Sequence, residues 1–106
     1  MEHLEEMVIK TKKDIEGVAE AFYQQRDQEG FENLVEVIDV VSKIVTSIEK
    51  INAGYEISKE SLDLETSLKE ATEAMVNKDT VLLADILKYD ITDSLDNILN
   101  KIKGQM

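Results

Sequence analysis

The sequence predicts an all-α protein that folds as an antiparallel up-down four-helix bundle. First, 106 residues with 42% hydrophobic and 33% charged side chains are enough for one domain with its own core, spanning residues 1–106. Second, the chain has no Pro and only four Gly, so few residues interrupt a helix. Third, apolar residues recur three or four positions apart in four segments. Because short loops join these segments, neighbouring helices should run antiparallel.

The first helix is expected over about residues 2–28. Its apolar face carries Leu4, Met7, Val8, Ile15, Val18 and Phe22, with Thr11 as a weaker member. Gly17 interrupts this pattern, and a glycine inside a helix costs about 1 kcal/mol relative to alanine. It marks either a close approach to another helix or a glycine that the fold tolerates.

The second helix is expected over about residues 31–52, after Gly30. Gly30, Gly54 and Gly104 each follow the end of a helical pattern, where glycine commonly terminates helices. The apolar residues cover most of the helix circumference and leave a narrow polar stripe. They are Phe31, Leu34, Val37, Ile38, Val40, Val41, Ile44, Val45, Ile48 and Ile51.

The third helix is expected over about residues 59–77. Residues 52–58 form the longest loop signal and are a plausible hinge through which two copies of the chain could exchange hairpins. Either Ser58 or Ser61 is expected to accept a backbone hydrogen bond at the N-terminus of this helix.

The fourth helix is expected over about residues 80–103, with Asp79 as its N-cap. Between Val81 and Ile91 more than half of its circumference is apolar, and the second helix shows a similar surplus. The surplus is either buried by neighbouring helices or forms an interface with a partner or a second copy. The predicted interface residues are Val81, Leu82, Ile86 and Tyr89. Tyr23, Tyr55 and Tyr89 favour an interface, because tyrosine suits half-buried positions with one end in water.

Composition excludes several kinds of chemistry. Without Cys there are no disulfides, thiolate nucleophiles, iron-sulfur clusters or zinc-thiolate sites. The isolated glycines form no phosphate-binding loop. A formal charge of −11 argues against binding to nucleic acid, which usually needs a clustered basic face.

Metal and carboxylate sites also have little support. His3, the one histidine, lies in the first turn of the first helix rather than in a bundle core, so no metal or cofactor is expected. Asp85 and Asp90, on either side of Tyr89, are the best candidates for a catalytic carboxylate pair, and they are expected to be solvated. The sequence therefore predicts a protein that is not an enzyme.

The sequence contains no candidate membrane span. No run approaches the ~18 apolar residues that a membrane-spanning helix needs. The first residues, Met1 to Glu6, are acidic where a signal peptide would be basic. We therefore expect a cytoplasmic protein that does not bind membranes.

Residues 78–91 read Lys-Asp-Thr-Val-Leu-Leu-Ala-Asp-Ile-Leu-Lys-Tyr-Asp-Ile. This stretch resembles a segment of small helical proteins of Gram-positive bacteria, in which an acid precedes Val-Leu-Leu-Ala-Asp and a later Leu and Tyr are followed by an acid. The resemblance rests on Leu83-Ala84-Asp85, Leu87 and Tyr89-Asp90. Some of those proteins have a Pro where this chain has Thr92-Asp93. The resemblance implies an uncharacterised family and no particular activity.

By type alone, a small acidic helical protein without Cys or Pro is also similar to the export chaperones of flagellar and type III secretion systems, which hold an amphipathic client segment in a bundle groove. This is an analogy of class. The leading hypothesis is a non-catalytic protein-binding module, an adaptor or chaperone-like protein that is itself a homodimer. The alternatives are a purely structural, self-associating protein and, with the least support, a carboxylate- or metal-dependent enzyme.

Overall fold

The computed structural model describes residues 2–55 and 57–104, and their side chains over residues 3–50 and 57–104. All its regular elements are helices, and no strand is present among the described residues. They are α1 (Glu2–Tyr23), α2 (Asp27–Tyr55), α3 (Ser58–Val76), α4 (Thr80–Asp85), the π-helix η1 (Ile86–Ile91) and α5 (Thr92–Gly104). Because α4, η1 and α5 follow one another without a break, they form one long helix. The described residues therefore form four helical segments, which confirms the all-α prediction.

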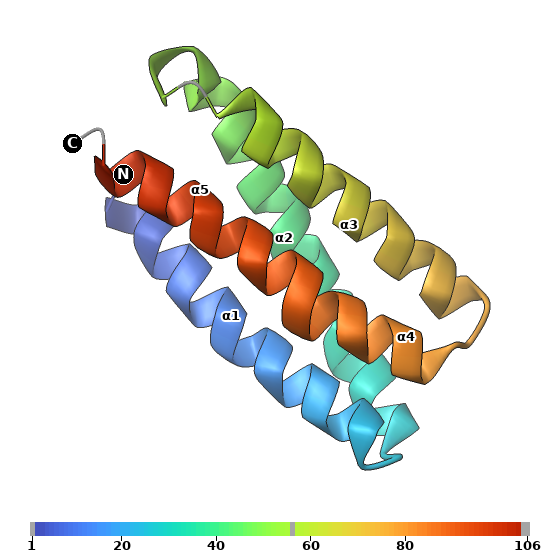
Figure 1. Cartoon of the computed structure of the whole chain (residues 1–106). Coiled ribbons are helices and arrows are strands. Elements are labelled where there is room, and N and C mark those ends of the chain that lie inside the picture. The colour runs from blue at the N-terminus through green and yellow to red at the C-terminus, as the bar shows by residue number, and fades with distance from the viewer. Residues whose placement is uncertain (1, 56, 105–106) are drawn as a thin grey trace.

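The four segments pack around a common core, in a molecule that measures 41 × 22 × 18 Å. α1 contacts α2 and all three parts of the α4–η1–α5 helix, and α3 likewise contacts α2 and that helix. Figure 1 shows the four segments side by side, with the start of α1 and the end of α5 at the same end of the molecule. Within the described residues, no helix combines the length and apolar character that crossing a membrane requires.

α1 and α3 end in the same backbone arrangement, which does not involve glycine. After α1 the amide of Gln25 donates to the carbonyl of Phe22, and the amide of Arg26 donates to that of Ala21. Gln25 has a φ of 61°, and Lys78 has a φ of 56° in the matching turn after α3. Both turns are Schellman motifs, in which the left-handed residue is usually glycine. α1 consequently ends at Tyr23 and not near residue 28 as the sequence predicted.

Gly30 does not terminate a helix, because α2 begins earlier, at Asp27. Gly30 is buried against Phe22, and an added Cβ would lie 2.7 Å from Cε1 of that ring. Phe22 also packs edge-to-face on Phe31, with ring centroids 5.0 Å apart. Gly30 therefore leaves room for the Phe22 ring, which packs from α1 against α2.

The other glycine predictions also change. Nothing lies within 4 Å of a Cβ placed on Gly17, so this residue is a tolerated glycine and not a close helix crossing. Gly54 lies inside the span of α2 and does not follow its end. The side chains of Ile51 and Tyr55 lie outside the described residues. Gly104 is the last residue of α5. Residues 52–55, expected in a loop, are helical.

The N-cap prediction is confirmed for α4 and wrong for α3. The carboxylate of Asp79 accepts a hydrogen bond of 3.1 Å from the amide of Leu82. The N-cap residue of α3 is Ile57, which has no capping side-chain bond. Ser58 is already the first residue of α3, and Ser61 is buried one turn later. Burial of Ile57 in the core favours this earlier start.

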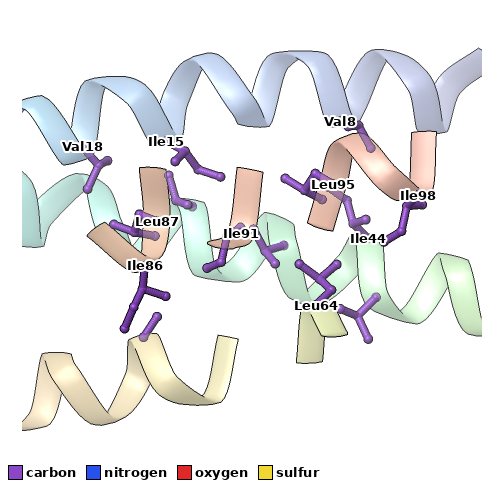
Figure 2. Packing of buried hydrophobic residues seen from close by; sticks show 14 of the residues in the cluster. Val8, Ile15, Val18, Ile44, Leu64, Ile86, Leu87, Ile91, Leu95 and Ile98 are labelled. Carbon is purple, nitrogen blue, oxygen red and sulfur yellow. The ribbon is translucent and has the colours of Figure 1, made fainter. Parts of the chain in front are cut away.

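The core runs the length of the molecule and accounts for most of the apolar surplus of α2. The fully buried residues of α2 include Leu34, Val41, Ile44 and Ile48, and Phe31, Ile38 and Val40 pack against them half-buried. Figure 2 shows Ile44 among side chains from the other helical segments, including Val8, Leu64 and Ile98. Thr11, buried as expected from its place on the apolar face, donates its hydroxyl to the carbonyl of Met7 at 2.6 Å.

Candidate functional site

The candidate site is built on η1, the π-helical turn inside the last helix. In an α-helix, residues five apart point about 140° away from each other. The hydrogen bonds of a π-helix join residues five apart, which brings such residues closer to one face. Ile86 and Ile91 have this spacing and are both buried. Single π-helical turns occur frequently at functional sites, so this segment is where a site is most expected.

Thr92 stabilises the end of the π-helical turn. Its amide donates to the carbonyl of Tyr89, and its hydroxyl donates to the carbonyl of Leu87 at 3.1 Å. The hydroxyl thus provides a partner for a carbonyl at a point where the regular pattern of helical bonds changes.

Four polar or aromatic side chains meet where η1 faces α1. We call Tyr23, Asp85, Lys88 and Tyr89 the tyrosine cluster. The hydroxyl of Tyr23 donates to Oδ1 of Asp85 at 2.5 Å, across 62 residues of sequence. The ammonium Nζ of Lys88 lies 5.5 Å from the ring centroid of Tyr23 and 5.5 Å from that of Tyr89. These distances are within the range of cation–π attraction, so both rings hold the same ammonium group.

The bond to Asp85 changes the acidity of Tyr23. Because the phenol donates to the Asp85 carboxylate, the neutral form of Tyr23 is favoured, and its pKa rises to about 12. Desolvation of the hydroxyl and the negative charge of Asp85 act in the same direction. Tyr23 therefore stays protonated at neutral pH, and its ring is fixed in position by the bond that its hydroxyl makes.

A cavity of about 320 Å³ opens beside the tyrosine cluster, between α1 and η1. Its walls are formed by Glu16, Ala19, Glu20, Tyr23, Lys88, Tyr89 and Thr92. The wall thus combines two aromatic rings with two carboxylates, which are the groups that attract a cation.

Three of the four predicted interface residues are exposed and one is not. Val81 is 62% exposed, Leu82 48% and Tyr89 53%. Ile86 is only 5% exposed, and Figure 2 shows its side chain directed toward α3. The inclusion of Ile86 was wrong, because it lies three residues after the buried Leu83 and next to the buried Leu87, on the face of the helix that packs on the core. Its amide still donates to the carbonyl of Leu82, so this part of the helix is α-helical. Val76, at the end of α3, is also exposed close to the turn that precedes Val81.

The candidate carboxylates are solvated. Asp85 and Asp90 are both exposed, and Asp85 binds the hydroxyl of Tyr23 rather than a second carboxylate. A different pair, Glu49 and Glu65, forms between α2 and α3. The hydrogen bond between these two carboxyl groups raises the pKa of Glu65, with a further contribution from desolvation and the charge of Glu49. Both residues are exposed, so water reaches the pair.

His3 is exposed in the first turn of α1. Across the described residues, no group of three or more His, Cys, Asp or Glu side chains is arranged to hold a metal ion.

The sequence does not predict that Tyr23 and Lys88 belong to one site, nor that Glu49 pairs with Glu65. Tyrosine at position 23 suits a half-buried position, but nothing in the local pattern connects it with residues on another helix. The one available signal was the presence of tyrosines at the ends of apolar stripes.

A family model described as a domain of unknown function, DUF8042, matches residues 1–101. No curated protein and no solved structure matches the chain. The family match agrees with the expectation of an uncharacterised family, whereas a Gram-positive source and a likeness to export chaperones stay predictions.

Proposed function

The chain belongs to this family of unknown function, and from the geometry of its surface we propose that it is a non-catalytic protein-binding module. Its binding surface consists of Val81, Leu82 and the tyrosine cluster. It acts as an adaptor or chaperone-like protein that holds a segment of another protein. The adaptor role has more support than a carboxylate enzyme, because the Glu49–Glu65 pair is open to water, whereas tuning of acid and base groups relies on desolvation.

The observation that carries the proposal is the exposure of apolar and aromatic side chains next to the π-helical turn. Val81 lies one helical turn before Asp85, on the same face of the helix. Leu82 and Tyr89 are about half exposed beside them. Other exposed apolar residues, such as Val35 and Leu62, lie on different helices. The exposed Tyr89 also lines, together with Tyr23, the cavity beside η1, and aromatic residues are enriched in protein interfaces.

The charge of the surface defines the chemistry of the partner. The protein carries a formal charge of −11, and Glu16 and Glu20 line the cavity itself. An acidic surface attracts a basic partner and accelerates its association. The proposed occupant is therefore an amphipathic segment of another protein that presents apolar side chains to Val81 and Leu82 and basic side chains to the cavity.

The proposal includes the antiparallel up-down arrangement of the bundle and a location in the cytoplasm. Connections of only two or three residues between the helical segments favour alternating directions. A nitroxide label on a cysteine introduced at Lys103 should then broaden amide signals in the first turn of α1. Broadening of signals near Tyr23 instead would contradict the arrangement.

The binding role is tested with a synthetic amphipathic peptide that carries leucines on one helical face and arginines on the other. Isothermal titration calorimetry should detect binding to the full chain and none to a scrambled peptide of the same composition. The double variant Val81→Ser/Leu82→Ser should bind about tenfold more weakly, because it removes apolar surface that the peptide buries. The control variant Val35→Ser/Leu62→Ser removes exposed apolar groups elsewhere and should bind like the unchanged protein.

Equal losses in the two double variants would contradict the proposal, since binding would then not depend on this surface. Sedimentation equilibrium over a wide concentration range tests self-association. A stable dimer that dissociates in Val81→Ser/Leu82→Ser would mean that a second copy covers this surface, and the protein would then be a self-associating one. Circular dichroism of each variant establishes that it is folded.

A further inference from the structure

Lys88 is held by two aromatic rings rather than by a carboxylate. Its Nζ is 5.5 Å from each of the ring centroids of Tyr23 and Tyr89, which belong to α1 and η1. Among the described side chains, no carboxylate lies within ion-pair distance of this ammonium group. The two rings therefore lie on either side of one cation, within the distance of cation–π attraction.

The site formed by the two rings is larger than its present occupant. The adjoining cavity of about 320 Å³ is comparable with the smaller ligand pockets of proteins. Glu16 and Glu20 contribute carboxylates to its wall. Their negative charge favours a second cation entering beside Lys88, or one that takes its place.

The two rings are held in different ways. Tyr23 is fixed because its hydroxyl donates to Asp85 at 2.5 Å. Tyr89 is 53% exposed, and Lys88 is exposed as well, so both can move toward water without opening the core. An incoming cation can therefore displace the flexible Lys88 side chain while the Tyr23 ring remains in place.

We propose that Tyr23 and Tyr89 bind the guanidinium group of an arginine from the partner protein, and that Lys88 is an internal competitor that this arginine displaces. Guanidinium is favoured over ammonium because it is planar, stacks on aromatic faces and is less strongly hydrated. The inference rests on the proposed function and adds the group that is recognised in the partner. Lys88 then makes binding selective, because only a cation that interacts more strongly with the rings replaces it.

The probe for this site is N-acetyl-arginine methylamide, added to the full chain and followed through the NMR signals of the tyrosine ring protons. Its neutral isostere, N-acetyl-citrulline methylamide, is the control ligand. The arginine probe should shift the ring signals of Tyr23 and Tyr89 in a saturable manner. Lys88→Gln should strengthen binding about three- to fivefold by removing the competitor. Tyr89→Leu should weaken it by a similar factor or more, and this exposed residue can be replaced without loss of the core.

The control variant is Lys43→Gln, which makes the same charge change at an exposed position on α2. If Lys88→Gln binds the arginine probe no more tightly than Lys43→Gln, the competitor role is refuted. If the citrulline probe shifts the rings equally, the site does not recognise charge and the proposal is overturned.

The two proposals fail separately. If the amphipathic peptide still binds through Val81 and Leu82 but the arginine probe does not bind, only the cation site is lost. If the arginine probe binds while the Val81→Ser/Leu82→Ser variant binds the peptide normally, the cation site stands and the proposed binding surface is wrong.

Discussion

Replacing each of two helical glycines by alanine should change stability in opposite directions. Gly17 and Gly30 both lie inside helices, where alanine is intrinsically favoured by about 1 kcal/mol. A Cβ at Gly17 meets nothing within 4 Å, so Gly17→Ala should raise the free energy of unfolding by about 1 kcal/mol.

At Gly30 the added Cβ would lie 2.7 Å from the ring of Phe22. Phe22 is only 2% exposed and packs on Phe31 with ring centroids 5.0 Å apart, so its ring has little room to move. Overpacking of a well-filled core costs about 1–3 kcal/mol, which exceeds the gain in helix propensity. Gly30→Ala should therefore lower the free energy of unfolding by about 1 kcal/mol, and the two variants should differ by roughly 2 kcal/mol or about 8 °C in Tm.

The assay is urea unfolding followed by circular dichroism, with thermal unfolding as a second measurement. Equal stabilisation by the two substitutions would refute the argument, because Phe22 could not then fill the space over Gly30. A third variant, Gly30→Ala with Phe22→Leu, tests the cause directly. The two substitutions should be less harmful together than the sum of their separate effects. Destabilisation by Gly17→Ala that grows with protein concentration would mean that a second copy covers α1 at this point.

Three further predictions concern titration and a helix end. In a spectrophotometric titration one tyrosine should ionise near pH 12, and Asp85→Asn should return the Tyr23 pKa toward 10. Because the pKa is raised in the folded state, the stability that this bond contributes is complete below pH 10 and is lost as the pH rises toward 12. A titration curve that Asp85→Asn leaves unchanged would contradict the assignment. The pKa of Glu65 is likewise raised, so its bond to Glu49 stabilises the fold at acidic pH, and this contribution disappears as the pH rises through that pKa. Glu65→Gln should therefore raise Tm at about pH 7 and lose that advantage as the pH falls through the raised pKa of Glu65, whereas an advantage that does not change with pH would count against the pair. Lys78→Gly should raise the free energy of unfolding by about 0.5 kcal/mol in urea unfolding. Glycine adopts the left-handed φ of 56° without strain, and this gain exceeds the loss from the greater flexibility of the unfolded variant. A destabilised variant would show that the Lys78 side chain has a role of its own.

The sequence predicted the helical segments better than their ends. The apolar spacing located all four segments, and Asp79 was correctly identified as an N-cap because an aspartate before an apolar run has a local structural reason to be there. The error over Gly30 arose because glycine was taken as the residue that ends a helix. The turn after α1 uses Gln25 instead, and Gly30 has a packing role that depends on a ring from another helix.

The candidate site was predicted only in part. Val81, Leu82 and Tyr89, which the sequence assigns to the apolar surplus of the last helix, are exposed. Ile86 belongs to the same apolar surplus but is buried, because it lies three residues after the buried Leu83, on the core face of the helix. The change from four-residue to five-residue hydrogen bonding affects the side chains that follow Ile86, and the local sequence contains no clear signal for it.

The sequence by itself determined the secondary structure class, the faces of the helices that are apolar and the kinds of chemistry that a chain without Cys cannot perform. These properties follow from composition and from hydrogen bonding between residues close together in the chain. Only the tertiary structure decided that Tyr23 meets Asp85 and Lys88, and that Glu49 meets Glu65. Such contacts depend on the rotation and relative height of helices packed against one another, which are set by the fit of many side chains across the core and not by any single stretch of sequence.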